Sequence, residues 1–187
     1  MPARARAAKA PARAGVTLIE MMITLAVMAV LGALAMPSLS AMATRQRLQS
    51  AANQLQADVA LAKLASAQHG QAVYLRFQPG SAWCYQLTTG PGGDCRQAAA
   101  SQASGVLRVV RAADHPGIAL VEASTIGVDL SRPGSLPALQ TAGQALFATR
   151  GGLQLRVRVG PQARASLCSV GLPISGTPAC PTDAAEH

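Results

Sequence analysis

Glu20 is the residue of this 187-residue chain whose surroundings demand a chemical explanation, because it is the sole charge between Val16 and Pro37. The 22 residues of that run are otherwise almost entirely apolar, and about 20 such residues suffice to cross a bilayer. A carboxylate inside a membrane helix costs at least about 2.5 kcal/mol, so it needs a partner. The run therefore predicts a transmembrane helix whose carboxylate has a role beyond anchoring.

A basic leader precedes the apolar run. Residues 1–15 carry no acidic side chain and four basic ones, which are Arg4, Arg6, Lys9 and Arg13. Such a charge bias keeps a segment on the cytoplasmic side. An ordinary secretory signal is cleaved after its apolar region, whereas the good candidate site here, Gly15, lies before it. Cleavage at Gly15 would keep the apolar helix and leave a free amine on Val16, one helical turn from Glu20.

The stretch GVTLIE, residues 15–20, resembles the processing site of type IV pilins and pseudopilins. The resemblance implies cleavage between Gly15 and Val16 by a prepilin peptidase, N-methylation of Val16, and polymerisation of the helix into a filament. It also implies that Glu20 pairs with the Val16 amine of a neighbouring subunit. Pro37 matches the helix-kinking proline of that family, whereas Val16 stands where most members have Phe. The competing interpretation is an uncleaved signal anchor in which Glu20 occurs by chance.

The four cysteines all follow the apolar run, at positions 84, 95, 168 and 180. An even number beyond the inner membrane indicates disulfides. We favour the local pairing Cys84–Cys95 and Cys168–Cys180, although four cysteines allow three connectivities. A zinc site is the alternative, but no two cysteines have CxxC spacing and the histidines are scattered, so we expect no metal.

Two kinds of secondary structure must position these residues. After Pro37 the chain reaches His69 without Gly or Pro, and apolar residues recur at helical spacing, which predicts an amphipathic continuation of the helix ending at Gly70. That stripe consists of Leu48, Ala52, Leu55, Val59 and Ala62. Beyond Gly70, β-rich runs alternate with turn residues. They predict strands at 73–77, 83–88, 106–111, 118–122, 126–130, 145–149, 153–159 and 165–170, with a loop at 131–143.

These elements define an α+β fold class, and by resemblance a pilin-like one, in which a long helix packs on an antiparallel β-sheet domain. The predicted domains are the leader at 1–15, the transmembrane and polymerisation helix at 16–37, its amphipathic continuation at 38–69, and a periplasmic β-rich domain at 70–187. The net charge is +8, but half of it belongs to the leader. A mildly basic mature chain with 3% aromatic residues does not indicate a stacking platform for nucleic acid.

The β-rich domain carries a second resemblance. Residues 83–85 (WCY) followed by Cys95 resemble a segment of pseudopilins of the general secretion pathway protein H and fimbrial T/U group. Residues 147–152 (FATRGG) resemble the F-x-x-x-G strand and turn of that group. Residues 161–168 (PQARASLC) with Cys180 resemble its closing segment, P-x-G-R-x-R-x-C and a last Cys.

The closing segment departs from the group at its basic motif. Residues 163–166 read ARAS where the group has G-R-x-R, a motif tied to DNA binding in some fimbrial T-type members. Arg164 remains, and Arg156 and Arg158 share one face of a predicted strand because they are two residues apart. Arginine donors suit phosphate oxygens, so these three are the candidate DNA contacts. A solvated strand face is the interpretation we favour.

The sequence contains no catalytic constellation. It has no GxSxG, HExxH or P-loop motif, and Asp114-His115 is expected to form a turn rather than an acid–base pair. Trp83 is expected in the core. We therefore predict that the protein is not an enzyme and uses no cofactor.

The resemblances imply a minor pseudopilin of a type II secretion system, similar to protein H. The alternative is a fimbrial T/U-like minor pilin of a type IV pilus, including a form that binds DNA for uptake. Expected partners are the prepilin peptidase and N-methyltransferase, other pilins or pseudopilins, the inner-membrane assembly platform and inner-membrane lipid, with DNA not favoured. The expected location is the inner membrane, with a cytoplasmic N-terminus and a periplasmic C-terminal domain, and then the filament.

Overall fold

The computed structural model describes residues 15, 17–90, 93–97, 104–129, 138–141, 143–160 and 162–181, with backbone alone at 34–37 and 138–141. The chain divides into two compact units, Met1–Ala41 and Met42–His187. A single helix, α1 (Leu18–His69), continues from the first unit into the second, and every described strand belongs to the second.

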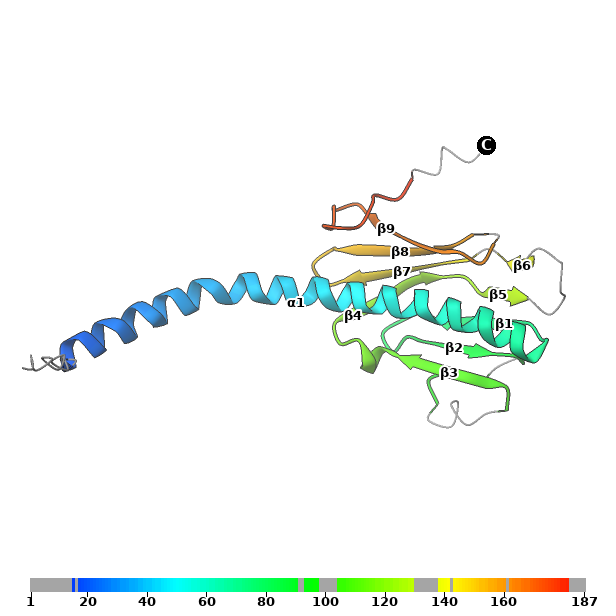
Figure 1. Cartoon of the computed structure of the whole chain (residues 1–187), viewed down its shortest axis with the longest axis horizontal. Coiled ribbons are helices and arrows are strands. Elements are labelled where there is room, and N and C mark those ends of the chain that lie inside the picture. Colours follow the sequence, from blue (N-terminus) through cyan, green and yellow to red (C-terminus); the bar gives the residue numbers. More distant parts are fainter. Residues whose placement is uncertain are drawn as a thin grey trace, which may run out of the picture. The chain divides into compact units, whose positions relative to one another are not determined.

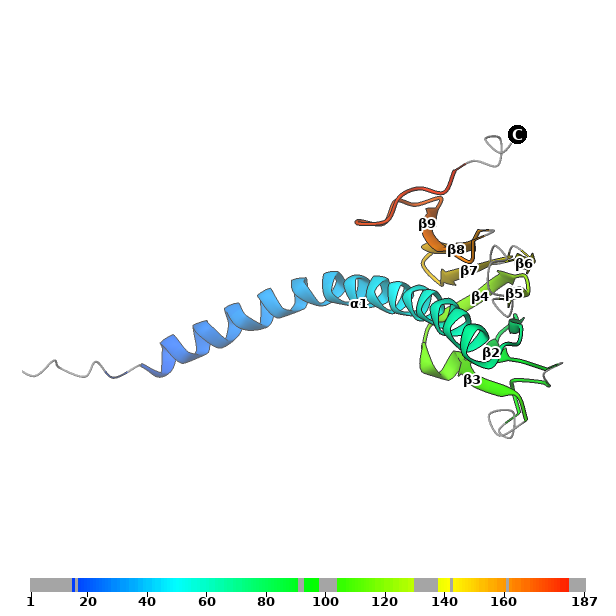
Figure 2. The same ribbon diagram turned by 45° about the vertical axis from the view of Figure 1, so that its right-hand side comes forward.

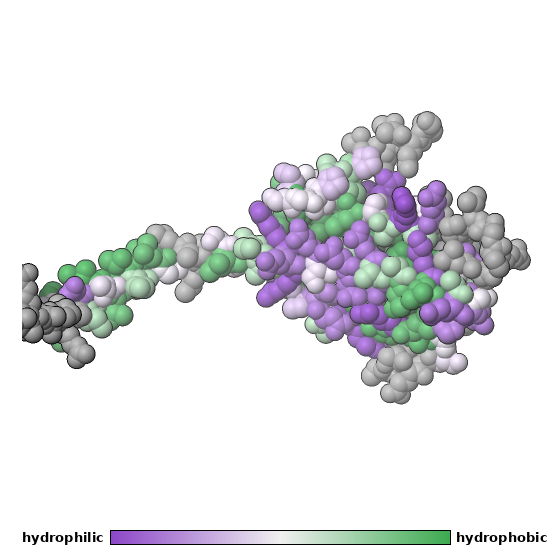
Figure 3. Space-filling view, in the orientation of Figure 1, coloured by the Kyte–Doolittle hydropathy of each residue, from purple (hydrophilic) through white to green (hydrophobic). Residues whose placement is uncertain are grey.

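The first part of α1 exposes its apolar side chains, which give this stretch of the helix its mainly hydrophobic (green) surface in Figure 3. The backbone N–H of Glu20 donates to the Thr17 hydroxyl at 3.3 Å, so Thr17 acts as the N-cap. The large apolar residues at 18–31 are 52–80% exposed. By length and composition α1 can cross a membrane. The helical backbone continues through Pro37.

The second part of α1 contributes a buried stripe. The five predicted stripe residues are all at most 1% exposed, which confirms the sequence prediction that they form core. The helix ends at His69, as predicted. Gly70 follows with φ of 62°, a left-handed conformation that glycine adopts at helix ends.

The strands form two antiparallel sheets. The first sheet has the order β3-β2-β1-β5-β6 and consists of β1 (Val73–Gln78), β2 (Cys84–Thr88), β3 (Val106–Arg111), β5 (Ile126–Asp129) and β6 (Ala138–Thr141). The second has the order β4-β7-β8-β9 and consists of β4 (Ile118–Ala123), β7 (Gly143–Thr149), β8 (Gln154–Val159) and β9 (Ala165–Val170). Within this unit, the second part of α1 lies across both sheets (Figures 1 and 2).

The core lies between α1 and the inner faces of the sheets. Trp83, Tyr85 and Phe147 are its largest buried side chains, each at most 1% exposed. The Trp83 indole N–H donates to the Ile118 carbonyl oxygen at 2.8 Å, so its polar atom is satisfied. The expectation that Trp83 belongs to the core is confirmed.

The α+β fold class, a long N-terminal helix followed by antiparallel sheets, is confirmed. Each of the eight predicted strands is present, although β2 starts after Trp83 and β7 starts earlier, at Gly143. The prediction of a loop at 131–143 is wrong where β6 pairs with β5. The Pro and Gly residues of that stretch flank 138–141 (ALQT), which leaves those four residues free to add to the edge of the sheet. Residues 131–137 and 142 lie outside the described residues.

Gly143 is placed where the two sheets meet. The chain passes from β4 in one sheet to β5 in the other through Ser124 and Thr125. A Cβ atom on Gly143 would lie 2.5 Å from Ile126 Cγ1 and 3.1 Å from the Thr125 carbonyl oxygen. Glycine therefore permits the close approach of β7 to this crossover.

Candidate functional site

The predicted processing site lies at the start of α1. Gly15 is exposed and lies outside the helix, which begins at Leu18. Val16, the predicted new N-terminus, lies outside the described residues.

Glu20 lies in the first turn of α1. Its side chain is exposed, among apolar side chains that are also exposed. The sequence Thr17 to Glu20 has the T-x-x-E spacing of a capping box, and its N–H to hydroxyl bond is present. The partial positive charge of a helix N-terminus favours a carboxylate at this position. The start of the helix therefore stabilises the Glu20 carboxylate, whereas surrounding lipid alone would disfavour its charge.

Two disulfides hold the domain. The structure joins Cys84 to Cys95 and Cys168 to Cys180, the local connectivity that the sequence favoured. The second bond fastens residues 178–180 to the edge of β9, where the Ser169 N–H donates to the Pro178 carbonyl at 2.8 Å. In the described part of the chain, no group of His, Cys, Asp and Glu side chains is arranged to hold a metal.

The three predicted DNA-contacting arginines are only partly brought together. Arg156 and Arg158 alternate with the buried residues Leu155, Val157 and Val159 on β8, so the predicted shared face exists. Arg158 and the exposed Arg164 line one concavity, and Arg156 is not among its lining residues. The Arg156 Nε atom is buried without a hydrogen-bond partner.

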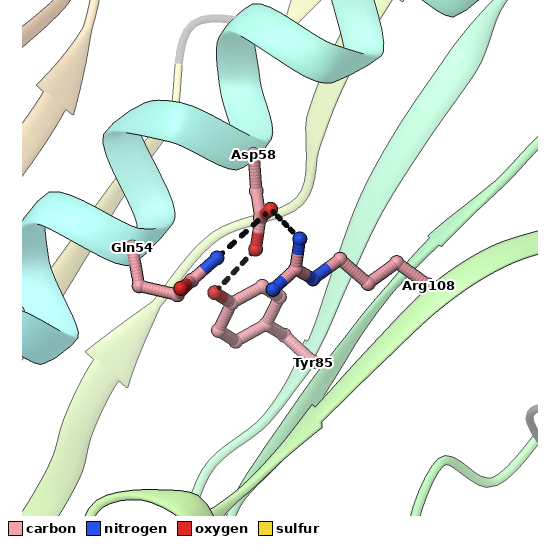
Figure 4. Close-up of polar contacts among 4 residues, drawn as sticks. All are labelled: Gln54, Asp58, Tyr85 and Arg108. Atoms are coloured by element: carbon pink, nitrogen blue, oxygen red, sulfur yellow. Dashed lines mark hydrogen bonds and ion pairs between the residues drawn. The ribbon is translucent and has the colours of Figure 1, made fainter.

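A buried polar cluster was missed by the sequence reasoning (Figure 4). Asp58 of α1 is 1% exposed and accepts hydrogen bonds from the Tyr85 hydroxyl at 2.7 Å and from Gln54 at 3.2 Å. Arg108 of β3 pairs with it at 3.3 Å. Burial, together with the charge of Asp58, raises the pKa of Tyr85 above its ordinary value. The cluster connects the helix to β2 and β3 and therefore serves the fold.

A sequence signal for this cluster existed. Asp58 stands directly before Val59 and three residues after Leu55, both members of the predicted apolar stripe. A carboxylate at that position must be buried with the stripe, and buried carboxylates require donors.

The expected turn at Asp114-His115 is confirmed. Residues Ala112–Asp114 form a single 3-10 turn, and the His115 ring stacks on Trp83 with 6.0 Å between centroids. Burial lowers the pKa of His115, and the charge of Asp114 opposes that effect. His115 is thus a packing residue at the edge of the core.

Comparison with known families supports the reading of the N-terminus. Residues 11–36 match the family described as the prokaryotic N-terminal methylation motif. That range contains the end of the basic leader, Gly15, Glu20 and most of the apolar run. No curated protein and no solved structure matches the chain.

Motif and fold together define a class. A prepilin-like signal at the start of one long apolar helix, followed by antiparallel sheets, supports a type IV pilin-like protein of the pilin or pseudopilin families. The motif implies processing by a prepilin peptidase and assembly with other pilins in a pilus or pseudopilus. It is also consistent with anchoring in the inner membrane through the N-terminal helix.

Proposed function

We propose that this protein is a minor pseudopilin of a type II secretion system, of the protein H kind, and that it acts by assembly rather than by catalysis. The observation that carries the proposal is the methylation motif at 11–36 at the head of α1. The resemblance of residues 83–85, Cys95 and the closing segment to the protein H and fimbrial T/U group supports a minor subunit of this kind. In the secretion system, such subunits help to initiate the pseudopilus that moves folded proteins across the outer membrane.

The mechanism follows from two charges. Cleavage after Gly15 creates a positive amine on Val16, and Glu20 supplies a negative charge one helical turn away. Each charge is costly in lipid, so a pair formed with a neighbouring subunit neutralises both and fixes the axial register between subunits. The helix first anchors the subunit in the inner membrane, and Glu20 then aids its extraction from the membrane into the filament.

The alternative is a fimbrial T/U-like minor pilin of a type IV pilus. It uses the same processing site and the same helix, so the motif supports both. A DNA-uptake form of this alternative requires Arg156, Arg158 and Arg164 to meet phosphate together. The structure gathers only Arg158 and Arg164 in one concavity, which counts against the DNA-uptake form.

The intact mass of the protein tests its processing. We expect protein from membranes of a host with a prepilin peptidase to have the mass of residues 16–187 plus one methyl group and minus four hydrogens. A Gly15→Leu variant should retain the leader and serve as the control. A wild-type mass that still includes residues 1–15 would show a simple membrane-anchored domain and would contradict the filament role.

A deletion strain tests which filament the protein serves. Loss of the protein should abolish secretion of folded proteins across the outer membrane while surface pili persist. Wild-type protein should restore secretion, and Glu20→Ala should not. Loss of pili with intact secretion would instead establish the minor-pilin alternative.

A further inference from the structure

The second unit has one end at which α1 enters it. The strands β4 and β8 begin at that end, and β7 and β9 end there, because their sheet is antiparallel throughout. The first turns of α1 within this unit lie at the same end in both views (Figures 1 and 2). We call this end the entry face, and it consists of Arg45 and Arg47 on α1, the connection 112–117, the turn 150–153 and the segment 171–176.

The chain itself brings the entry face to the membrane surface. The apolar run ends at Pro37, and only residues 38–41 separate it from the second unit. Leu39 and Met42 are still more than half exposed, so the apolar surface of the helix continues almost to Arg45. At 1.5 Å per residue, Arg45 lies within about 12 Å of Pro37. The headgroup region extends about 5–8 Å beyond the hydrocarbon core, and a long arginine side chain can reach back to it.

The exposed charges of the entry face are mainly positive. Arg45, Arg47 and Arg150 are exposed, and within the described part of the chain none of them pairs with an acidic side chain. Asp114 is the one acidic residue of the face, and it accepts a hydrogen bond from the backbone N–H of Arg111 at 2.8 Å. Anionic lipids attract basic residues that lie beside a transmembrane helix, and arginine donors suit phosphate oxygens. The face therefore complements an anionic lipid surface.

Leu172 adds an apolar contact to the entry face. Its side chain is 53% exposed, whereas Ile174, two residues further on, is buried in the core and anchors the segment 171–176. Basic side chains combined with an exposed large apolar side chain are typical of surfaces that lie on a bilayer. The arginines of such a surface meet the phosphates, while the apolar side chain enters the boundary with the acyl chains.

We propose that the entry face is a lipid-binding surface, which rests on anionic headgroups of the inner membrane before the subunit is assembled. Arg45, Arg47 and Arg150 bind lipid phosphates, and Leu172 enters the boundary between headgroups and acyl chains. The proposal rests on the membrane anchoring that belongs to the proposed function, and it holds for a pseudopilus and for a pilus. Extraction of the helix into a filament breaks these contacts, so the entry face adds to the work of extraction.

Fluorescence quenching in reconstituted vesicles tests the proposal. The full-length chain, with its disulfides formed, carries a fluorophore on Leu172→Cys, and the vesicles contain a trace of lipid with a nitroxide on its headgroup. Quenching should increase as phosphatidylglycerol is added to phosphatidylcholine, and salt should reduce it. Each arginine beside an anionic surface favours contact by about fivefold. Arg150→Gln should therefore weaken the contact by about that factor, and Arg45→Gln combined with Arg47→Gln should weaken it further.

Arg164 provides the matched control. It is exposed between β8 and β9, at the opposite end of the second sheet, so Arg164→Gln should leave the quenching unchanged. A fluorophore on Gln71→Cys should be quenched weakly, because Gln71 follows the last turn of α1, about 30 Å along the helix from the entry face. Equal quenching in neutral and anionic vesicles would overturn the proposal. So would equal losses with Arg150→Gln and Arg164→Gln, or quenching at Gln71 as strong as at Leu172.

Carbonate extraction of the same vesicles separates this proposal from the proposed function. We expect the chain to stay in the vesicles. A chain that stays there but shows no dependence of quenching on anionic lipid would overturn the lipid-binding surface and leave the filament role standing. A chain that carbonate removes would overturn the anchoring of α1 and both proposals with it.

Discussion

At the scale of single residues, Tyr85 and Asp58 give a direct prediction about stability. The Tyr85→Phe substitution removes the 2.7 Å hydrogen bond to a carboxylate that is 1% exposed. A hydrogen bond to a buried charged group contributes about 1.5–3 kcal/mol, so the free energy of unfolding should fall by about that amount. Urea denaturation of the full chain in detergent measures it.

Arg108 supplies the comparison for that prediction. Its side chain is 43% exposed although Asp58 is buried, so water screens the Arg108 charge and its contribution should lie nearer to the value of about 1 kcal/mol for an exposed ion pair. Arg108→Gln should therefore cost less than Tyr85→Phe. Equal losses for the two variants would show that the charge pair contributes as much as the buried phenol and would contradict this prediction.

The partly buried position of His115 predicts that the stability of the fold depends on pH. Burial beside Trp83 lowers the pKa of His115 in the folded protein, while the unfolded chain keeps the ordinary value of about 6.5. The unfolded state thus binds a proton first, and stability should decrease as the pH falls below about 6.5 toward the folded pKa. Melting temperatures between pH 8 and 5 should show this decrease, and His115→Gln should reduce it.

A second histidine makes the pH experiment specific. His69 is exposed at the last position of α1, so His69→Gln should leave the decrease in place. If His69→Gln flattens the profile as much as His115→Gln does, the burial argument is wrong.

Residue patterns in the sequence were informative where partners are local. The apolar stripe of α1 repeats every three or four residues, so the buried positions from Leu48 to Ala62 could be predicted. Asp58 could not be assigned its partners, because Tyr85 lies 27 residues away in sequence and Arg108 lies on another strand. Only the folded sheet shows that a phenol and a guanidinium reach the same carboxylate.

At the scale of elements, the crossover between sheets depends on Gly143. A methyl group there would meet Ile126 Cγ1 at 2.5 Å, and overpacking of a filled site costs about 1–3 kcal/mol. Gly143→Ala should lower the free energy of unfolding by that amount. Gly151→Ala is the matched control, since its added Cβ would meet the Thr149 hydroxyl oxygen at an ordinary 3.8 Å. A harmless Gly143→Ala would mean that the two sheets shift apart easily.

Helices and strands were predictable where their own composition determines the secondary structure. They were less predictable where pairing with a neighbouring strand determines it. The strands β3 and β9 have the predicted bounds, because β-branched and apolar runs end at turn residues. β6 was missed because a short run between Pro and Gly residues becomes a strand only when an edge is available beside it. The concavity that Arg158 and Arg164 line could likewise not be predicted, because three strands and the segment at 178–181 form it together.

At the scale of the whole molecule, folding and membrane anchoring should be separable. The buried core extends from Leu48 to Ile174, and both disulfides follow residue 83, so all of these lie in the unit Met42–His187. The apolar residues at 18–31 are exposed and add nothing to that core. A chain that starts at Met42 and is exported to the periplasm should therefore fold without residues 1–41.

The fragment should unfold cooperatively, contain no free thiol and resist proteolysis. Leu55→Ala in the fragment should lower the free energy of unfolding by about 2–5 kcal/mol, the usual cost of a buried cavity, because Leu55 is fully buried. A broad transition, or no effect of Leu55→Ala, would show that residues 1–41 are needed to order the core. Cooperative unfolding of the fragment would mean that the domain can fold outside the membrane while the first part of α1 remains in the bilayer. Assembly would then add an already folded subunit to the filament.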